Sequence, residues 1–369
     1  MAPAKPSLEL LRSLSDEHVL RALMIQRRAT RAELALATGL SKPTVAESVR
    51  RLSTAGVVVD TGERTTGPGR IGTYYGLAAT TGCALVVSIA PEGIVAETVD
   101  VYGDVVARAQ AEVSRAPGAR HVARTLTGVA GDVAGSCAGP VRLAVVSAAD
   151  PVDRETGRLV ELPDAPFLVG ELDAPAVLAD LVRGPVIVDN DVNWMARAEH
   201  SVADCVYVYL GEGLGAAVVS DGEVRRGHAG LAGEIAHALT IGPGGEATRL
   251  TEVFAALGLR RPGSTAIDVP ALLRAVDADP ELRAALGRAV AGVLYAAVAL
   301  ADPAVVVVGG PWGRPMVPVI ARELARAPRH VPVQAAAVDE EPALVGAREA
   351  ALAHLRDAVV AAAPREAAV

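Results

Sequence analysis

The stretch PVIVDNDVNWMARAEH, residues 185–200, decides how the rest of this sequence is interpreted. It begins with an apolar run typical of a buried strand, which stops at Asp189, Asn190 and Asp191 and is followed by a helical pattern. Polar groups are costly to bury at the end of a strand. Two explanations are open: these side chains cap the next helix, or they hold a ligand.

Charge is divided unevenly along the chain. Its 369 residues carry a net charge of -8. Residues 1–77 carry 11 basic and 7 acidic side chains, a net charge of +4, whereas the remainder carries 24 basic and 36 acidic ones, a net charge of -12. This length suffices for two or three domains. A basic end on an acidic body indicates a head that binds nucleic acid.

Signals for export or for a membrane are weak. Residues 1–15 lack the apolar core of a signal peptide. The longest apolar stretch, residues 289–310, is broken by Asp302 and Pro303, which predicts a buried helix followed by a strand rather than a membrane span. Three cysteines lie far apart without a CxxC motif, so we expect buried thiols in a reducing, cytoplasmic compartment without a membrane partner: Cys83, Cys137 and Cys205.

The first part of the chain predicts three short helices. Residues 15–28 carry an apolar stripe at helical spacing. Thr30 and Glu33 form a capping box that begins a second helix, and Gly39 ends it. Ser41 caps a third helix, which has a proline in its first turn, where no backbone donor is lost.

This order is that of a helix-turn-helix whose third helix reads DNA, and two short β runs around the glycine-rich loop 61–70 predict a wing. We therefore expect a winged helix-turn-helix domain over residues 1–78. A small helical protein-interaction domain with a solvated basic face is the alternative. The residues expected to bind DNA lie in the third helix, away from its apolar stripe, and in the wing: Ser41, Lys42, Thr44, Glu47, Ser48, Arg50, Arg51, Arg64 and Arg70.

The body, residues 79–369, mixes strands and helices in two similar halves, which predicts a two-lobed α/β fold with a cleft between the lobes. The sequence GEGLG, residues 211–215, forms the turn of a predicted hairpin and permits either a tight turn or close approach of a ligand. Glu234 and His237 are spaced so that one helical turn places both on one face. A capped helix with a satisfied histidine explains this pair equally well.

Three motifs occur together in the body: VDNDVNWMARAE at 188–199, the stretch from GEGLG to GEIAH ending at His237, and ADPAVVVVGGP at 301–311. With the N-terminal winged helix, they resemble the ROK family of repressors, open reading frames and sugar kinases, over residues 15 to 355. The resemblance implies an actin-like, hexokinase-like body of the ribonuclease H-like class, with a sugar in the interlobe cleft.

The resemblance also implies roles for single residues. In the family's N-D-x-N motif, matched by Asn190 and Asp191, the asparagine and the aspartate bind sugar hydroxyls, and in the kinases the aspartate is the general base. The family's E-x-G-H motif, whose Glu and His contact the sugar, is matched by Glu234 and His237, with alanine in place of glycine. Glu252 falls where a further sugar-binding glutamate is expected. These five residues are the expected ligand site.

Two departures separate this chain from the kinases. At the position of their D-x-G-G-T-K phosphate loop this chain has SIAPEG, residues 88–93. Ser88 occupies the position of the aspartate and Glu92 adds negative charge, and both changes disfavour phosphate binding. Many family members also bind zinc through the motif histidine and downstream cysteines. No cysteine follows His237 here, and a zinc site needs about four ligands, so we expect no metal and no cofactor.

Together these observations favour a transcription regulator without enzyme activity. We expect it to repress, to bind a double-stranded DNA operator as a homodimer or higher oligomer, and to sense a sugar or sugar derivative. An ATP-dependent sugar kinase with an added domain is the alternative, since Asp191, GEGLG and the pair Gly309 and Gly310 are retained. A protein-interaction module that has lost both activities is a third possibility.

Overall fold

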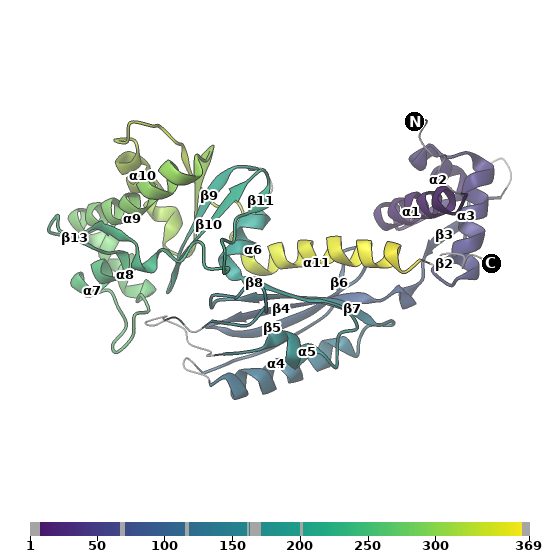
Figure 1. Ribbon diagram of the computed structural model, residues 1–369, viewed down its shortest axis with the longest axis horizontal. Coiled ribbons are helices and arrows are strands. Elements are labelled where there is room, and N and C mark those ends of the chain that lie inside the picture. Colours follow the sequence, from purple (N-terminus) through teal and green to yellow (C-terminus); the bar gives the residue numbers. More distant parts are fainter. Residues whose placement is uncertain are drawn as a thin grey trace.

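The computed structural model describes residues 8–66, 71–114, 118–160, 162, 171–199 and 202–363. Figure 1 shows a small helical head at one end, a first lobe below a long C-terminal helix, and a second lobe at the opposite end. The expected order of a winged head followed by a two-lobed α/β body is confirmed.

The head contains the three predicted helices, and each predicted cap is present. The Thr30 hydroxyl accepts from the Glu33 amide at 3.3 Å while the Glu33 carboxylate accepts from the Thr30 amide at 2.7 Å. Gly39 ends its helix with a φ of 70°, and Ser41 caps the next. The helices are α1 (Leu8–Gln26), α2 (Arg31–Thr38) and α3 (Lys42–Thr54), and the antiparallel sheet β1-β3-β2 comprises β1 (Arg28–Thr30), β2 (Val58–Arg64) and β3 (Thr73–Leu77).

The first lobe is one five-stranded sheet covered on both faces. Its order is β6-β5-β4-β7-β8, with β4, β5 and β6 antiparallel and β4, β7 and β8 parallel. Helices α4 and α5 cover one face and α11 covers the other (Figure 1). The elements are a 3-10 turn η1 (Ala79–Thr81), β4 (Cys83–Ala90), β5 (Gly93–Val99), β6 (Val105–Ala111), α4 (Ala119–Ala134), β7 (Val141–Ala148), α5 (Ala174–Leu178), β8 (Val186–Asn190) and α11 (Pro342–Ala361).

The second lobe repeats this topology. Its sheet has the order β11-β10-β9-β14-β15, in which the first three strands are antiparallel and the last two run parallel to β9. Two halves with one strand order form the ribonuclease H-like body expected from the sequence. Its elements are α6 (Asp191–Ala198), β9 (Cys205–Leu210), β10 (Leu214–Ser220), β11 (Glu223–Val224), η2 (Ile235–His237), β12 (Leu239–Ile241), β13 (Ala247–Arg249), α7 (Leu250–Ala256), α8 (Val269–Ala278), α9 (Pro280–Ala301), β14 (Val305–Gly309), α10 (Gly313–Leu324) and β15 (Val333–Ala335).

Helix α9 is the one helix, among the described residues, that is long and apolar enough to cross a membrane by length and composition alone. Its side chains Leu286, Val290 and Leu294 are buried in the core of the second lobe with Phe254 and Trp312. The predicted succession of a buried helix and a strand is confirmed, because α9 is followed by β14.

The cysteines differ from the expectation. Cys83 and Cys137 form a disulfide, so the prediction of buried thiols is wrong for this pair, whereas Cys205 is buried and free. The reason is that α4 returns the chain to the start of β4, which brings the two Cα atoms to 6.4 Å, a separation that a disulfide spans. Their separation of 54 positions along the chain gives no sign of this proximity in the sequence.

Candidate functional site

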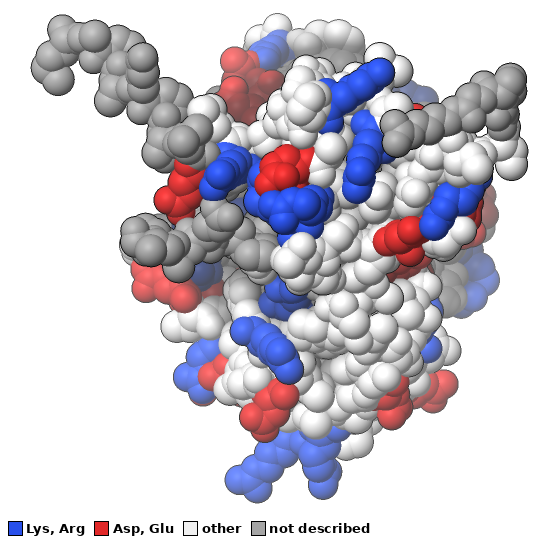
Figure 2. Space-filling view, turned by 90° about the vertical axis from the view of Figure 1, so that its right-hand side faces the viewer, with Lys and Arg blue, Asp and Glu red and all other residues white. Residues whose placement is uncertain are grey.

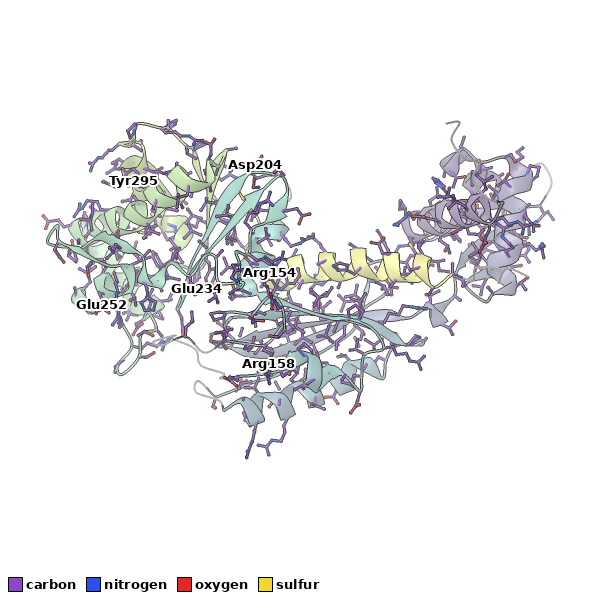
Figure 3. All side chains as sticks on the ribbon, in the orientation of Figure 1. Arg154, Arg158, Asp204, Glu234, Glu252 and Tyr295 are labelled. Carbon is purple, nitrogen blue, oxygen red and sulfur yellow. A yellow bond between two sulfur atoms is a disulfide. The ribbon has the colours of Figure 1, made fainter. Side chains whose placement is uncertain are left out.

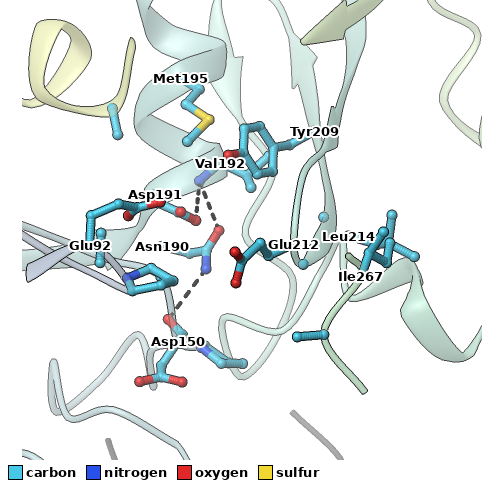
Figure 4. Close-up of a pocket in the computed structure, with 18 of the residues that line it drawn as sticks. Glu92, Asp150, Asn190, Asp191, Val192, Met195, Tyr209, Glu212, Leu214 and Ile267 are labelled. Carbon is cyan, nitrogen blue, oxygen red and sulfur yellow. Dashed lines mark hydrogen bonds between the residues drawn. The ribbon is translucent and has the colours of Figure 1, made fainter. Parts of the chain in front are cut away.

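A cleft of about 1670 Å³ separates the two lobes. The first lobe contributes the β4–β5 turn and the ends of β7 and β8, and the second lobe contributes the β9–β10 turn and the segment before η2 (Figure 4). The carboxyl ends of parallel strands are where open α/β sheets bind ligands. The cleft is therefore the candidate ligand site.

Asn190 ends β8 and caps α6. Its side-chain oxygen accepts from the Val192 amide at 3.0 Å, and its amide nitrogen donates to the carbonyls of Asp150 at 3.3 Å and Ala148 at 3.4 Å. The capping explanation is therefore confirmed for Asn190, which also lines the cleft; that it holds a ligand stays a prediction. Its hydrogen bonds hold the ends of β7 and β8 together beside Asp191.

Asp191 is the first residue of α6 and lines the cleft. Its Oδ1 accepts from the Val192 amide at 2.8 Å. Burial raises the pKa of this carboxyl, the backbone hydrogen bond from Val192 lowers it, and the negative charges of Glu234, Asp150 and Glu92 raise it, so that the pKa is about 7. A carboxyl with this pKa can accept hydrogen bonds from hydroxyl groups, and it can also take up a proton near neutral pH.

Two neighbouring polar side chains are structural. Asp189 is buried, and its Oδ2 accepts from the Arg226 guanidinium at 2.6 Å while its Oδ1 accepts from Asn193 at 2.7 Å. Neither Asp189 nor Asn193 is among the residues that line the cleft. They fix the start of α6, and so the direction of Asp191. From the sequence, Asp189 is one of three polar residues at the strand end, and its role could not be separated from that of Asp191.

Glu234 and His237 come from the second lobe and both line the cleft. They lie at either end of η2, a short 3-10 turn rather than an α-helix. Gly233, directly before it, has a φ of 101°, and its carbonyl accepts from the Ala216 amide at 2.9 Å. Burial raises the pKa of Glu234 to about 7. The structure therefore brings Asn190, Asp191, Glu234 and His237 to one cleft from both lobes.

The β4–β5 turn consists of Pro91 and Glu92, and Ser88 precedes it on β4; all three line the cleft. Figure 4 shows Glu92 reaching toward Asp191. This turn presents a carboxylate and a proline, which lacks an amide hydrogen, where a phosphate-binding loop would present several backbone N–H groups. The arrangement does not suit a phosphate.

Other cleft residues were missed by sequence reasoning. Glu212 lies in the GEGLG turn and pairs with Arg261 at 2.5 Å, Tyr209 precedes that turn, and Asp150 follows β7. For Asp150 a signal existed, since an acidic residue follows an apolar strand as at Asp189. Arg261 has no such signal, because it reaches the cleft from a loop 49 residues further along the chain than Glu212.

Glu252 is placed differently from the other predicted ligand residues. It is not among the residues that line the cleft, and its carboxylate pairs with the Arg260 guanidinium at 3.0 Å. Figure 3 shows Glu234 near the junction of the lobes and Glu252 on the outer part of the second lobe. The structure therefore does not bring Glu252 to the site, because α7 turns it toward Arg260 instead.

The exposed side of α3 holds part of the predicted DNA-binding set. Ser41, Lys42, Glu47 and Arg50 are exposed and Thr44 is half-buried. Arg50 donates to Glu47 at 2.6 Å, and in the wing Arg64 pairs with Asp60 at 2.8 Å. Figure 2, which views the molecule from the side of the head, shows basic and acidic side chains interspersed.

Two residues of the set face the core, which corrects the prediction that they lie away from it. Ser48 is fully buried. Arg51 is largely buried and holds Asp16 of α1 through two hydrogen bonds of 2.6 and 3.2 Å, and it also donates to the Ser48 hydroxyl at 3.0 Å. These contacts join α3 to α1, so both residues serve the packing of the head. Arg70 lies outside the described residues.

In the described part of the chain, no group of three or more His, Cys, Asp or Glu side chains is arranged to hold a metal ion. The cleft carboxylates come from separate loops of both lobes. That the protein binds no metal stays a prediction.

Comparison with known proteins assigns both parts of the chain. Residues 94–249 match the model of the ROK family, and residues 12–59 match a model described as winged helix-turn-helix DNA-binding. A winged helix-turn-helix domain is thus joined to a body of the sugar-kinase fold. Residues 94–249 of the body belong to the ROK family, and the fold of a ROK family regulator extends over the rest of the chain.

Two solved structures share this fold. A ROK family transcriptional regulator, described as a homolog of the E. coli MLC protein, is 18% identical with a TM-score of 0.64, and the match covers 95% of this chain and 99% of that chain. A ROK hexokinase from Thermus thermophilus is 24% identical with a TM-score of 0.58, over 74% of this chain and 99% of that chain. The regulator's match therefore extends beyond the share of this chain that the hexokinase covers.

Two curated relatives match over short segments. A xylose repressor from Caldicellulosiruptor bescii is 29% identical over 92 residues, which are 23% of this chain and 23% of that protein. A glucokinase from Halalkalibacterium halodurans is 39% identical over 74 residues, 18% of this chain and 22% of that protein. The matched segments thus span less than a quarter of the length of either relative.

Proposed function

We propose that this protein is a DNA-binding transcriptional repressor that senses a sugar or sugar derivative in the interlobe cleft and has no kinase activity. The observation that carries the proposal is the combination of a winged helix-turn-helix head with a cleft whose phosphate-loop position holds Pro91 and Glu92. A regulator needs the head and can dispense with phosphate binding, whereas a kinase needs the reverse. Such a regulator works in the cytoplasm, beside the chromosome.

The proposed effector is a polyol, because the cleft offers converging acceptors and donors. Asp191 and Glu234 provide carboxylates that accept hydrogen bonds from hydroxyls, and His237 adds a nitrogen. The ligand would bring these groups together across the two lobes. Because ligand and DNA bind at different sites of one molecule, each changes the affinity of the other by the same factor.

The proposed DNA complex is that of a homodimer on a pseudo-palindromic operator. In this arrangement α3 of each protomer enters a major groove, and the distance between the heads must match the half-site spacing. A change in the angle between the lobes would change that distance and so the affinity. Lys42, which is exposed at the start of α3, is the proposed phosphate contact.

The test is fluorescence anisotropy of labelled DNA from upstream of this protein's own gene, with excess nonspecific competitor. Saturable binding that survives competitor, weakens in Lys42→Ala and responds to D-xylose or D-glucose supports the proposal. Asp191→Ala is expected to abolish the sugar response and leave DNA binding intact. Absence of specific binding to any fragment in a genomic selection would contradict the proposal.

A sugar kinase is the second candidate, and one observation favours it. The pKa of Asp191, about 7, suits a general base that deprotonates an attacking hydroxyl at neutral pH. Gly309 ends β14, and Gly310 directly after it has a φ of 89°, a conformation that favours glycine. Formation of ADP from ATP in the presence of D-glucose that is lost in Asp191→Asn would establish this activity. If the wild type forms no more ADP than Asp191→Asn, the result supports the regulator.

A further inference from the structure

Two elements of the first lobe extend from the cleft to the head. Strand β5 begins beside Glu92 in the cleft and ends before the turn Asp100–Asp104, which contacts the head. Helix α11 begins with Pro342 in the cleft and lies along the sheet toward the head (Figure 1). A helix of 20 residues spans about 30 Å, so α11 bridges the two sites as one rigid element.

At the cleft end, α11 is preceded by a residue with unusual geometry. Glu341 lines the cleft and has a φ of 45°, in the left-handed region that non-glycine residues seldom adopt. Its carboxylate forms a two-pronged ion pair with the Arg108 guanidinium of β6, with one of the contacts at 2.8 Å. This ion pair holds a backbone conformation that is unfavourable in itself, and such outliers gather at sites that switch.

Arg108 also connects Glu341 to the middle of α11, through Glu97. It also donates to Glu97 of β5 at 2.7 Å, and Glu97 in turn accepts from Arg348 of α11 at 3.0 Å. The Glu97 side chain is only 1% exposed. A buried carboxylate is costly unless it is paired, so displacement of either arginine forces the other groups to rearrange. Cleft, sheet and helix are therefore joined by one network.

At the far end, α11 holds the head. Arg356 donates to the carbonyls of Val101, in the β5–β6 turn, at 3.1 Å and of Met24, in α1, at 3.2 Å. Asp357 pairs with Arg21 of α1 at 2.9 Å. Any shift of α11 along its axis therefore changes the position of α1 relative to the body.

Resting on the proposed function, we propose that α11 transmits the state of the cleft to the head, with the ion pair between Glu341 and Arg108 as its starting point. A ligand that contacts the Glu341 carboxylate competes with Arg108 for it. Release of Glu341 lets the start of α11 leave the left-handed conformation, and Arg348 and Arg356 move with the helix. The position of α1, and with it the presentation of α3 to DNA, then differs between the two states.

The first test compares two adjacent carboxylates. Glu341→Gln breaks the ion pair with Arg108, whereas Glu340→Gln changes an exposed neighbour in the same way. With full-length protein and no sugar present, Glu341→Gln is expected to change the dissociation constant for operator DNA roughly threefold or more, a size typical of coupling through a protein. Glu340→Gln is expected to leave it unchanged. Equal constants for wild type and both variants would overturn the proposal.

The second test determines whether the effect of Glu341→Gln on DNA binding depends on the contacts of α11 with the head. In an Arg356→Gln background, in which the hydrogen bonds to the head are altered, Glu341→Gln is expected to have no effect on the DNA dissociation constant. Additive effects of the two substitutions, as expected for independent sites, would overturn the route through α11.

A third measurement does not depend on DNA. Hydrogen exchange of the full-length protein is expected to be faster in Glu341→Gln than in Glu340→Gln at residues 352–361 and 100–104. Exchange that is unchanged there contradicts the proposed connection. If the exchange differs but no DNA binding exists, the connection stands and the proposed function fails, so the two failures are distinguishable.

Discussion

Burial, together with the negative charges of Glu234, Asp150 and Glu92, sets the titration of Asp191. Its pKa is about 7 in the folded protein, compared with 3.8 for an ordinary aspartate. Below about pH 4 the group is protonated in both the folded and the unfolded chain, so it contributes nothing to stability. Between about pH 4 and pH 7 only the unfolded chain ionises, so the free energy of unfolding falls as the pH rises.

Asp191→Asn removes this titration. We expect the variant to be more stable than wild type by on the order of 2 kcal/mol above pH 7, since solvent reaches part of this side chain, and to match it near pH 4. Urea unfolding at several pH values measures the difference. Glu340→Gln, at an exposed position outside the cleft lining, is the control. A stability gain that is independent of pH would show that Asp191 does not titrate in this range.

Arg51 and Lys42 lie on the same helix, but we expect their substitution to affect different properties, stability for Arg51 and DNA binding for Lys42. Arg51→Ala leaves Asp16 of α1 without its partner in a largely buried position, and should lower the free energy of unfolding by about 3 kcal/mol. Lys42→Ala should leave stability unchanged, weaken DNA binding and reduce the salt dependence by about one counterion. Chemical unfolding and anisotropy at several salt concentrations separate the two. Unaltered stability of Arg51→Ala would contradict the structural role.

At the scale of elements, the short turn that carries Glu234 and His237 depends on Gly233. A Cβ atom at Gly233 would lie 1.8 Å from the Ala216 carbonyl oxygen, and the residue has a φ of 101°. Gly245 has a similar φ of 89° but open space around it. Gly245→Ala is therefore expected to cost about 1 kcal/mol, and Gly233→Ala more than about 3 kcal/mol, because the backbone must also move.

Gly233→Ala is also expected to abolish the sugar response, because η2 would shift away from α6. Urea unfolding gives the stability difference, and anisotropy with D-xylose or D-glucose gives the response. If both glycine variants lose equal stability, the collision with Ala216 is relieved without cost, and the turn is more adaptable than this structure indicates.

The helices of the head were predictable because their signals are local. The capping box of Thr30 and Glu33 and the left-handed cap at Gly39 depend on side chains within one turn. Which residues of α3 face the core was less predictable. Ser48 lies on the same buried stripe as Val45, Val49 and Leu52, but its polar side chain led to its assignment to the surface. Its hydrogen-bond partner is Arg51 of the same helix, which is itself held by Asp16 of α1.

For the cleft, the sequence predicted four residues that lie in two of its motifs, and it missed others, among them those that only the packing of distant elements brings there. Asn190 and Asp191 are adjacent, so a strand that ends in polar residues was sufficient to find them. Arg261 comes from a loop far along the chain, and the pairing of Glu252 with Arg260 depends on how α7 is turned. Contacts of this kind follow from packing of whole elements, which no short stretch of sequence specifies.

At the scale of the molecule, the Tyr102 hydroxyl is one of the contacts that join the head to the body. The Tyr102 hydroxyl accepts from the Leu77 amide at 3.1 Å and donates to the Arg27 carbonyl at 3.3 Å. The Arg27 guanidinium also lies over the Tyr102 ring, 5.4 Å from its centroid. Arg27 directly precedes β1, and Leu77 is the last residue of β3. A single side chain of the β5–β6 turn thus holds two backbone groups of the head.

Tyr102→Phe is therefore expected to loosen the head without disturbing either lobe. It leaves the Leu77 N–H and the Arg27 carbonyl without this partner, at a cost of about 1 to 2 kcal/mol, and retains the stacking with Arg27. In calorimetry, unfolding of the head should move to lower temperature and separate from that of the body. Tyr74→Phe, which retains the ring that stacks with Arg28, is the control. A single unshifted transition would mean that the helix contacts of α11 suffice to hold the head in place.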